Sequence, residues 1–174
     1  LLEVEAEAFW SCTSLKTVHF PSTVTTIGDG AFYDCSKLKQ ITIPQGVTEL
    51  GARVFYYCRD LETVVLPDGL TSIGERAFAN CSNLTFVKLP NSVNDLGKEA
   101  FMECTKLTSV NIPTSVKVIK ESTFDECAFQ SITIPSGVTE VQKNAFTACK
   151  NLTSVKMPDK ITKLGWEIFS GCNK

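Results

Sequence analysis

Residues 35–57 read CSKLKQITIPQGVTELGARVFYY, and the next cysteine, Cys58, begins a similar stretch. The pattern fills the chain of 174 residues. Cysteine occurs at positions 12, 35, 58, 81, 104, 127, 149 and 172, a period of 23 residues with one interval of 22. All seven prolines and eight of the eleven phenylalanines keep the same intervals. Three residue types that share one period, and its one shorter interval, indicate a tandem array of a single structural unit.

The first half of each unit predicts two short strands. Apolar and polar residues alternate up to Ile43, which is the pattern of a half-buried strand. Pro44 lacks a backbone N–H and ends this strand. Residues 47–50 are again short and extended in character, and predict a second strand. Gly51 follows, which indicates a tight turn or a positive φ.

The second half of each unit predicts one or two turns of helix. Ala31 and Cys35, for example, are four residues apart, and Phe32 adjoins Ala31. That spacing gives a helix a single inward face. The sequence therefore predicts an α/β fold with helical turns opposite the strands.

One such unit cannot bury its own apolar face, so the copies must stack. Stacking places the strands in a parallel sheet, each about 4.8 Å from the next. We expect a single solenoid over residues 1–174, with one 22-residue unit near 127–149. There Phe129 takes the leucine position, and Lys120 and Gln142 replace the glycine. These changes predict a local kink.

Composition excludes several classes of protein. With 43% hydrophobic residues and a net charge of −2, the chain is neither disordered nor a basic nucleic-acid binder. No apolar run approaches the roughly 18 residues that insert into a membrane. The first residues lack a basic start, so we expect no signal peptide in this fragment.

The cysteines allow three interpretations. The first is a row of buried thiols that pack as small apolar groups. Disulfides are the second, because the count is even and neighbouring units lie near bonding distance. Zinc is the third, but a tetrahedral site needs four converging ligands and a row does not converge. The first interpretation is favoured, and we expect no cofactor and no metal.

No catalytic residues are predicted. A thiol nucleophile needs a base within reach, and the one histidine, His19, occupies an outward strand position. The glycines are spaced one per unit and form no phosphate-binding loop. We therefore expect the protein not to be an enzyme.

Two columns of residues point outward from the predicted strands. The first contains Thr17, Gln40, Thr63, Phe86, Ser109, Ser131 and Ser154. The second contains His19, Thr42, Val65, Lys88, Asn111, Thr133 and Lys156. Most are small and polar, which suits any solvated strand. Phe86 is the exception, and Val65 lies diagonally beside it.

A large apolar group among polar ones is the usual anatomy of a binding hot spot. The predicted ligand-binding residues are Thr42, Thr63, Val65, Phe86, Lys88 and Asn111. A second candidate patch follows the Ala-Phe positions and contains Trp10, Tyr33, Tyr56 and Tyr57. Aromatic residues with a polar group are enriched at interfaces. The alternative is that these rings pack against neighbouring units.

The repeat resembles that of the BspA-like leucine-rich repeats, with proline, glycine, Ala-Phe and cysteine at the family's offsets. The resemblance implies a right-handed superhelix with a parallel sheet on the concave face, and short second strands and helical turns on the convex side. Family members are typically secreted or surface proteins of bacteria and some parasitic protists, and are thought to act as adhesins. The resemblance thus implies a secreted or cell-surface location.

The same resemblance implies a protein or glycan partner, such as one in the extracellular matrix or on another cell. We hypothesise an adhesin-like recognition module that binds through the concave face, without nucleic acid. The alternative is a passive spacer within a larger surface protein. The chain starts and stops within a unit and shows no capping unit. We therefore expect a fragment of a longer array that could self-associate end to end.

Overall fold

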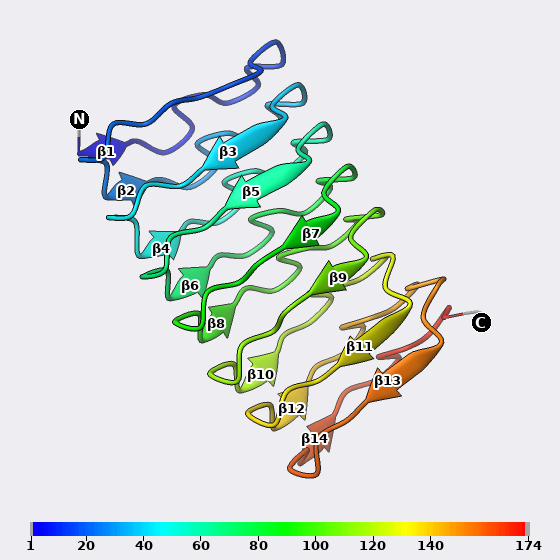
Figure 1. Ribbon diagram of the computed structural model, residues 1–174. Coiled ribbons are helices and arrows are strands. Elements are labelled where there is room, and N and C mark those ends of the chain that lie inside the picture. Colours follow the sequence, from blue (N-terminus) through cyan, green and yellow to red (C-terminus); the bar gives the residue numbers. More distant parts are fainter. Residues whose placement is uncertain (1, 173–174) are drawn as a thin grey trace.

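The computed structural model describes residues 2–172 as a stack of coils, one for each repeat (Figure 1). Each regular coil contributes one strand to each of two rows. The main row contains β3 (Gln40–Thr42), β5 (Thr63–Val65), β7 (Phe86–Val87), β9 (Ser109–Val110), β11 (Ser131–Thr133) and β13 (Ser154–Lys156). The second row contains β1 (Glu3–Val4), β2 (Thr26–Ile27), β4 (Glu49–Leu50), β6 (Ser72–Ile73), β8 (Asp95–Leu96), β10 (Val118–Ile119), β12 (Glu140–Val141) and β14 (Lys163–Leu164).

Both rows are parallel, and their register follows the repeat. Gln40 pairs with Thr63, 23 residues later. Across the short unit the offset is 22, as in the pairing of Val118 with Glu140. Hydrogen-bonded pairing is interrupted in the main row between β5 and β7 and between β9 and β11. The interruption between β5 and β7 lies where the repeat has its regular length. An interruption is therefore no sign of a kink, and the kink predicted at the short unit stays a prediction.

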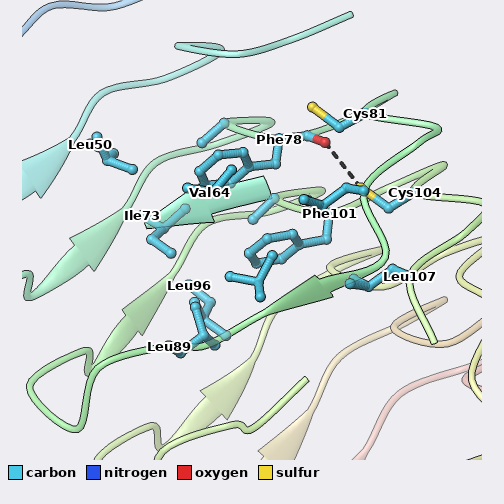
Figure 2. Packing of buried hydrophobic residues seen from close by; sticks show 14 of the residues in the cluster. Leu50, Val64, Ile73, Phe78, Cys81, Leu89, Leu96, Phe101, Cys104 and Leu107 are labelled. Atoms are coloured by element: carbon cyan, nitrogen blue, oxygen red, sulfur yellow. Dashed lines mark hydrogen bonds between the residues drawn. The ribbon is translucent and has the colours of Figure 1, made fainter. Parts of the chain in front are cut away.

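A column of stacked phenylalanine rings forms the centre of the core. The rings of Phe78 and Phe101, drawn in Figure 2, are 5.3 Å apart between centroids and 8° from parallel. The same stacking continues on both sides, from Phe9 to Phe169. Phe20 and Phe129 contact the column edge-on. Offset stacking of this kind stabilises beyond the burial of apolar area, by about 0.5–1.5 kcal/mol per pair.

The predicted helical turns are wrong: residues 2–172 contain no helix. In the segment that holds Phe32, every second backbone N–H donates a hydrogen bond to the next coil. Gly30 N donates to Ala52 O, and Asp34 N donates to Tyr56 O, at 2.8 and 2.7 Å. Gly30 and Asp34 also have positive φ values of 60° and 52°. An α-helix needs negative φ throughout and keeps its N–H groups within the segment, so this segment is a series of turns instead.

The glycine after each second strand is required by the distance between coils. A Cβ atom on Gly97 would lie 2.4 Å from the carbonyl carbon of Gly74 in the preceding coil. In the irregular region Gln142 takes this position, and its Oε1 accepts a hydrogen bond from Glu121 N at 3.2 Å. The backbone bond between the two coils is kept there, since Gln142 N donates to Ile119 O at 2.8 Å.

The position of a phenylalanine in the column should set its contribution to stability. Phe78 is fully buried between two rings, and Phe78→Ala should lower the free energy of unfolding by about 3–5 kcal/mol. Phe169 is partly buried and stacks on Phe146 alone, so Phe169→Ala should cost clearly less. Urea denaturation of the two variants measures the difference. Equal losses would contradict the assignment of Phe78 to a continuous core.

Candidate functional site

The fourteen outward residues of the main row form one surface, which we call the main-strand face. It consists of Thr17, His19, Gln40, Thr42, Thr63, Val65, Phe86, Lys88, Ser109, Asn111, Ser131, Thr133, Ser154 and Lys156. Every one of these residues is exposed, as the alternation in the sequence predicts. The face follows the row of arrows from β3 to β13 in Figure 1.

Val65 and Phe86 are the two large apolar side chains exposed on this face. Each keeps 50% of its surface accessible. Val65 ends β5 and Phe86 begins β7, on neighbouring coils. The other large exposed apolar residues within 2–172 lie elsewhere, on the second row or in the turns. The two side chains therefore interrupt an otherwise polar surface.

A shallow hollow lies beside this pair. It has a volume of about 360 Å³ and is lined by Val65, Leu66, Lys88 and Pro90 together with Gln45 and Asp68. A neighbouring hollow of about 480 Å³ includes His19, Thr42 and, again, Gln45. The shared glutamine makes the two hollows adjacent, so the first half of the main-strand face is grooved next to its apolar pair.

Asn111 differs from the other predicted ligand-binding residues, because its side chain forms hydrogen bonds with the backbone of the preceding coil. Its Oδ1 accepts a hydrogen bond from Leu89 N at 3.0 Å, and its Nδ2 donates to Leu89 O at 2.9 Å. In a regular coil the equivalent N–H, that of Ile43, donates to the backbone oxygen of Val65. The amide of Asn111 thus replaces a backbone partner. We leave it out of the contact set proposed below.

The second candidate patch is packed against itself. Trp10 stacks on Tyr33 with ring centroids 3.7 Å apart and 7° from parallel. Tyr56 lies 5.1 Å from Tyr33 and 4.3 Å from Tyr57. Burial raises the pKa of Tyr56 to about 12, and the hydrogen bond with Tyr57 adds to the shift. Because Trp10 and Tyr33 stack face to face between neighbouring coils, this geometry favours packing between coils over ligand binding.

The cysteines contribute hydrogen bonds that the sequence did not reveal. Each thiol from Cys35 onward donates to the carbonyl oxygen of a phenylalanine in the preceding coil, such as Cys104 Sγ to Phe78 O at 3.1 Å (Figure 2). The equivalent distances elsewhere are 3.2 to 3.3 Å. Cysteine is therefore both an apolar group and a donor.

The state of the cysteines bears on the disulfide and zinc interpretations. All eight are unpaired: six are buried, Cys12 is exposed and Cys172 is partly buried. Burial raises the pKa of the central thiols well above the usual value of about 9. Within residues 2–172, no three His, Cys, Asp or Glu side chains gather as metal ligands.

Charged side chains form a row across four coils. The carboxylate of Glu99 pairs with Arg76 and, at 3.4 Å, with Lys98. Glu121 lies 3.2 Å from both Lys98 and Lys143. One period of 23 residues separates Arg76 from Glu99 and Lys98 from Glu121. Opposite charges at that separation are the feature of the sequence that could have predicted these ion pairs.

Asp125 lies in a locally acidic environment. Its pKa is raised to about 6, first by burial and then by the neighbouring carboxylates of Glu126, Glu103 and Glu99. The equivalent position in other coils holds uncharged residues such as Ala79 and Met102. Asp125 therefore destabilises the coil when it is ionised.

Comparison with known proteins identifies the repeat. Residues 2–128 and 71–174 match the BspA type leucine rich repeat region, which is counted in 6 copies. The chain belongs to the BspA-type leucine-rich repeat family. No curated protein matches the chain significantly.

Three solved structures resemble this BspA-type array. A leucine-rich repeat protein from Bacteroides ovatus is 32% identical with a TM-score of 0.92, over 95% of this chain and 43% of that one. The leucine-rich repeat protein of T. pallidum is 34% identical with a TM-score of 0.78, over 99% and 71%. A leucine-rich cell surface protein from Faecalibacterium prausnitzii is 28% identical with a TM-score of 0.59, over 99% and 65%. The chain thus spans less than half of the Bacteroides ovatus protein.

The described part of this BspA-type array contains no helix long and apolar enough to cross a membrane.

The buried thiols predict loss of stability in alkali. Unfolded cysteines ionise above pH 9, whereas Cys58, Cys81, Cys104 and Cys127 stay protonated when folded. The native state then binds more protons, so stability is complete below pH 9 and falls as the pH rises. Each thiol buried in this way contributes a limiting slope of about 1.4 kcal/mol per pH unit. Urea denaturation between pH 8 and 10 measures the total slope, and Cys104→Ala should reduce it by about a sixth, because six cysteines are buried. A midpoint that does not move over this range would contradict the burial of these thiols.

Removing the charge of Asp125 should stabilise the protein at neutral pH. A folded pKa of about 6 means that its favourable contribution is present below pH 4 and is lost as the pH rises through 6. Asp125→Asn should therefore raise the free energy of unfolding by about 1–2 kcal/mol at pH 7, with little effect at pH 4. The control is Asp159→Asn, at an exposed carboxylate after Pro158. A stabilisation that is the same at both pH values would refute the electrostatic cause.

Proposed function

We propose that this array is a non-enzymatic recognition module of a secreted or cell-surface protein, and that it binds a protein or glycan partner through the main-strand face. The observation that carries the proposal is the exposed pair Val65 and Phe86 on a grooved and otherwise polar surface. Lys88, Thr63 and Thr42 surround the pair and complete the contact set.

Family membership supports this proposal. Leucine-rich repeat arrays present a broad surface made of one short strand per coil, which suits extended contact with a macromolecule. One similar structure is described as a cell surface protein. A hot spot of aromatic and apolar side chains within a polar rim is the usual source of affinity at such a surface. The partner class, matrix proteins or another cell surface, follows from the family resemblance.

Replacement of Phe86 tests the site. Purified chain is passed over immobilised fibronectin, fibrinogen, laminin and type I collagen in a surface plasmon resonance experiment. Phe86→Thr, which keeps β-propensity, should weaken binding to any bound matrix protein by tenfold or more. The matched control is Leu164→Ser, which removes an equally exposed apolar side chain from β14.

Two results would count against the proposal. Unchanged affinity of Phe86→Thr for a bound matrix protein would exclude the proposed face as the binding site. Absence of binding to all four proteins and to cultured cells would favour the passive spacer.

A further inference from the structure

The main-strand face carries no carboxylate. The chain contains 19 aspartate and glutamate residues, yet none of them occupies the fourteen outward positions of this face. The charged side chains there are Lys88 and Lys156. The outward positions of the second row differ, since they include Glu3, Glu49, Asp95 and Glu140. The fourteen outward positions are thus free of acidic groups, although Asp68 lines the hollow beside Val65 and Lys88.

Lys88 has no ion-pair partner among the described residues. Some other lysines are paired, as Lys98 is with Glu121 and Lys163 with Glu140. Asp68 lines the same hollow as Lys88, but the two side chains form no ion pair. The ammonium group of Lys88 therefore stands free beside the apolar wall of the hollow, where an incoming carboxylate could pair with it.

Phe86 and Lys88 have the spacing of an extended chain. They are two residues apart in the segment that begins with β7, and both side chains are exposed on the same face. Residues at i and i+2 of a strand are separated by about 6.6 Å. A peptide that lies extended along β7 repeats its own side chains at the same interval. One of its side chains can therefore cover Phe86 while the next on that side reaches Lys88.

We infer that the main-strand face binds an extended acidic peptide segment of its partner. An apolar side chain of the segment packs on Phe86 and Val65, and an Asp or Glu two positions away pairs with Lys88. This inference rests on the proposed function and deepens it by naming the chemistry of the partner. The fourteen outward positions offer such a segment no repelling carboxylate, and the acidic group that it meets at the hollow is Asp68.

An anionic polysaccharide fits the same surface less well. Binding of a polysulfated chain depends on several cations in a cluster, whereas Lys88 and Lys156 lie on coils three repeats apart. A polysaccharide also offers no apolar side chain for Phe86. The peptide is therefore the occupant that uses both the apolar pair and the charge.

Peptide titration of the isotope-labelled chain, followed by amide chemical shifts, tests this inference. The probes are capped ten-residue peptides of alternating Ser and Thr that carry a central Leu-Thr-Glu or Glu-Thr-Leu. At least one should shift the amides of residues 63–66 and 86–89 in a saturable way. Three control peptides should bind at least fivefold more weakly: one with Lys for Glu, one with Ser for Leu, and one with Leu-Thr-Thr-Glu, which places the two side chains on opposite faces of a strand.

Variants of the protein separate the charge from the apolar contact. Lys88→Gln should weaken the Glu peptide at least fivefold and leave a Leu-Thr-Gln peptide unchanged. Lys88→Arg should retain binding, and Lys156→Gln, in the same column but far from Phe86, should have no effect. Raising the salt concentration from 50 to 500 mM should weaken the Glu peptide alone.

Three results with the peptides would overturn the inference. These are equal binding of the Lys peptide, equal binding of the Leu-Thr-Thr-Glu peptide, and no saturable shift on the main-strand face at several millimolar of either Glu peptide. Binding of heparin at Lys88 without binding of the acidic peptides would do the same and assign the charge to a polysaccharide. If a matrix protein binds in a Phe86-dependent way while the peptides fail, the proposed function stands and this inference alone is wrong.

Discussion

The distance between successive coils constrains every other feature of this protein. Neighbouring backbones approach so closely that a methyl group on Gly97 would overlap the coil before it. At this spacing, the ring of each phenylalanine covers the next, each thiol reaches a carbonyl of the previous coil, and alternate amides of the turns bond to the following coil. Between residues 2 and 172, fourteen residues other than glycine adopt positive φ in the turns, at a cost of about 1–2 kcal/mol each. Hydrogen bonds between coils offset that cost, so the turns are stable only in the stack.

Much of this arrangement was predictable, because a repeat reports the same position many times. The strand halves, the inward phenylalanines and the outward position of Phe86 follow from alternation and period alone. The prediction of helical turns was wrong, because the spacing of Ala31 and Cys35 suits a helix and a pair of turns equally well. The deciding contact, Gly30 N to Ala52 O, lies between coils and leaves no mark on local spacing.

The candidate site also has features that the sequence predicts and features that it does not. That Val65 and Phe86 are exposed could be inferred from the sequence, since it depends only on which face of a strand a residue occupies. The hydrogen bond between the Asn111 side-chain amide and Leu89 could not be inferred, because it depends on a backbone group 22 residues away. The aromatic patch shows the same limit: its composition suggests an interface, but the stacking of Trp10 on Tyr33 satisfies the rings within the fold. The chemistry of a side chain suggests which residues could bind a ligand. Whether such a residue is available depends on its contacts with neighbouring coils.

The turns give the stack a direction. In each turn segment three amides, such as those of Gly30, Phe32 and Asp34, donate to the following coil, and none of the described bonds of this set runs the other way. Aligned peptide dipoles add, as they do along a helix axis. The turn layer is therefore polarised along the whole array, with its positive pole toward the later coils, the opposite of the polarity of an α-helix. A further coil can join this layer only in the same orientation, because a reversed coil would bring donor to donor or carbonyl to carbonyl. Growth of such an array, by gene duplication or by assembly, is head-to-tail.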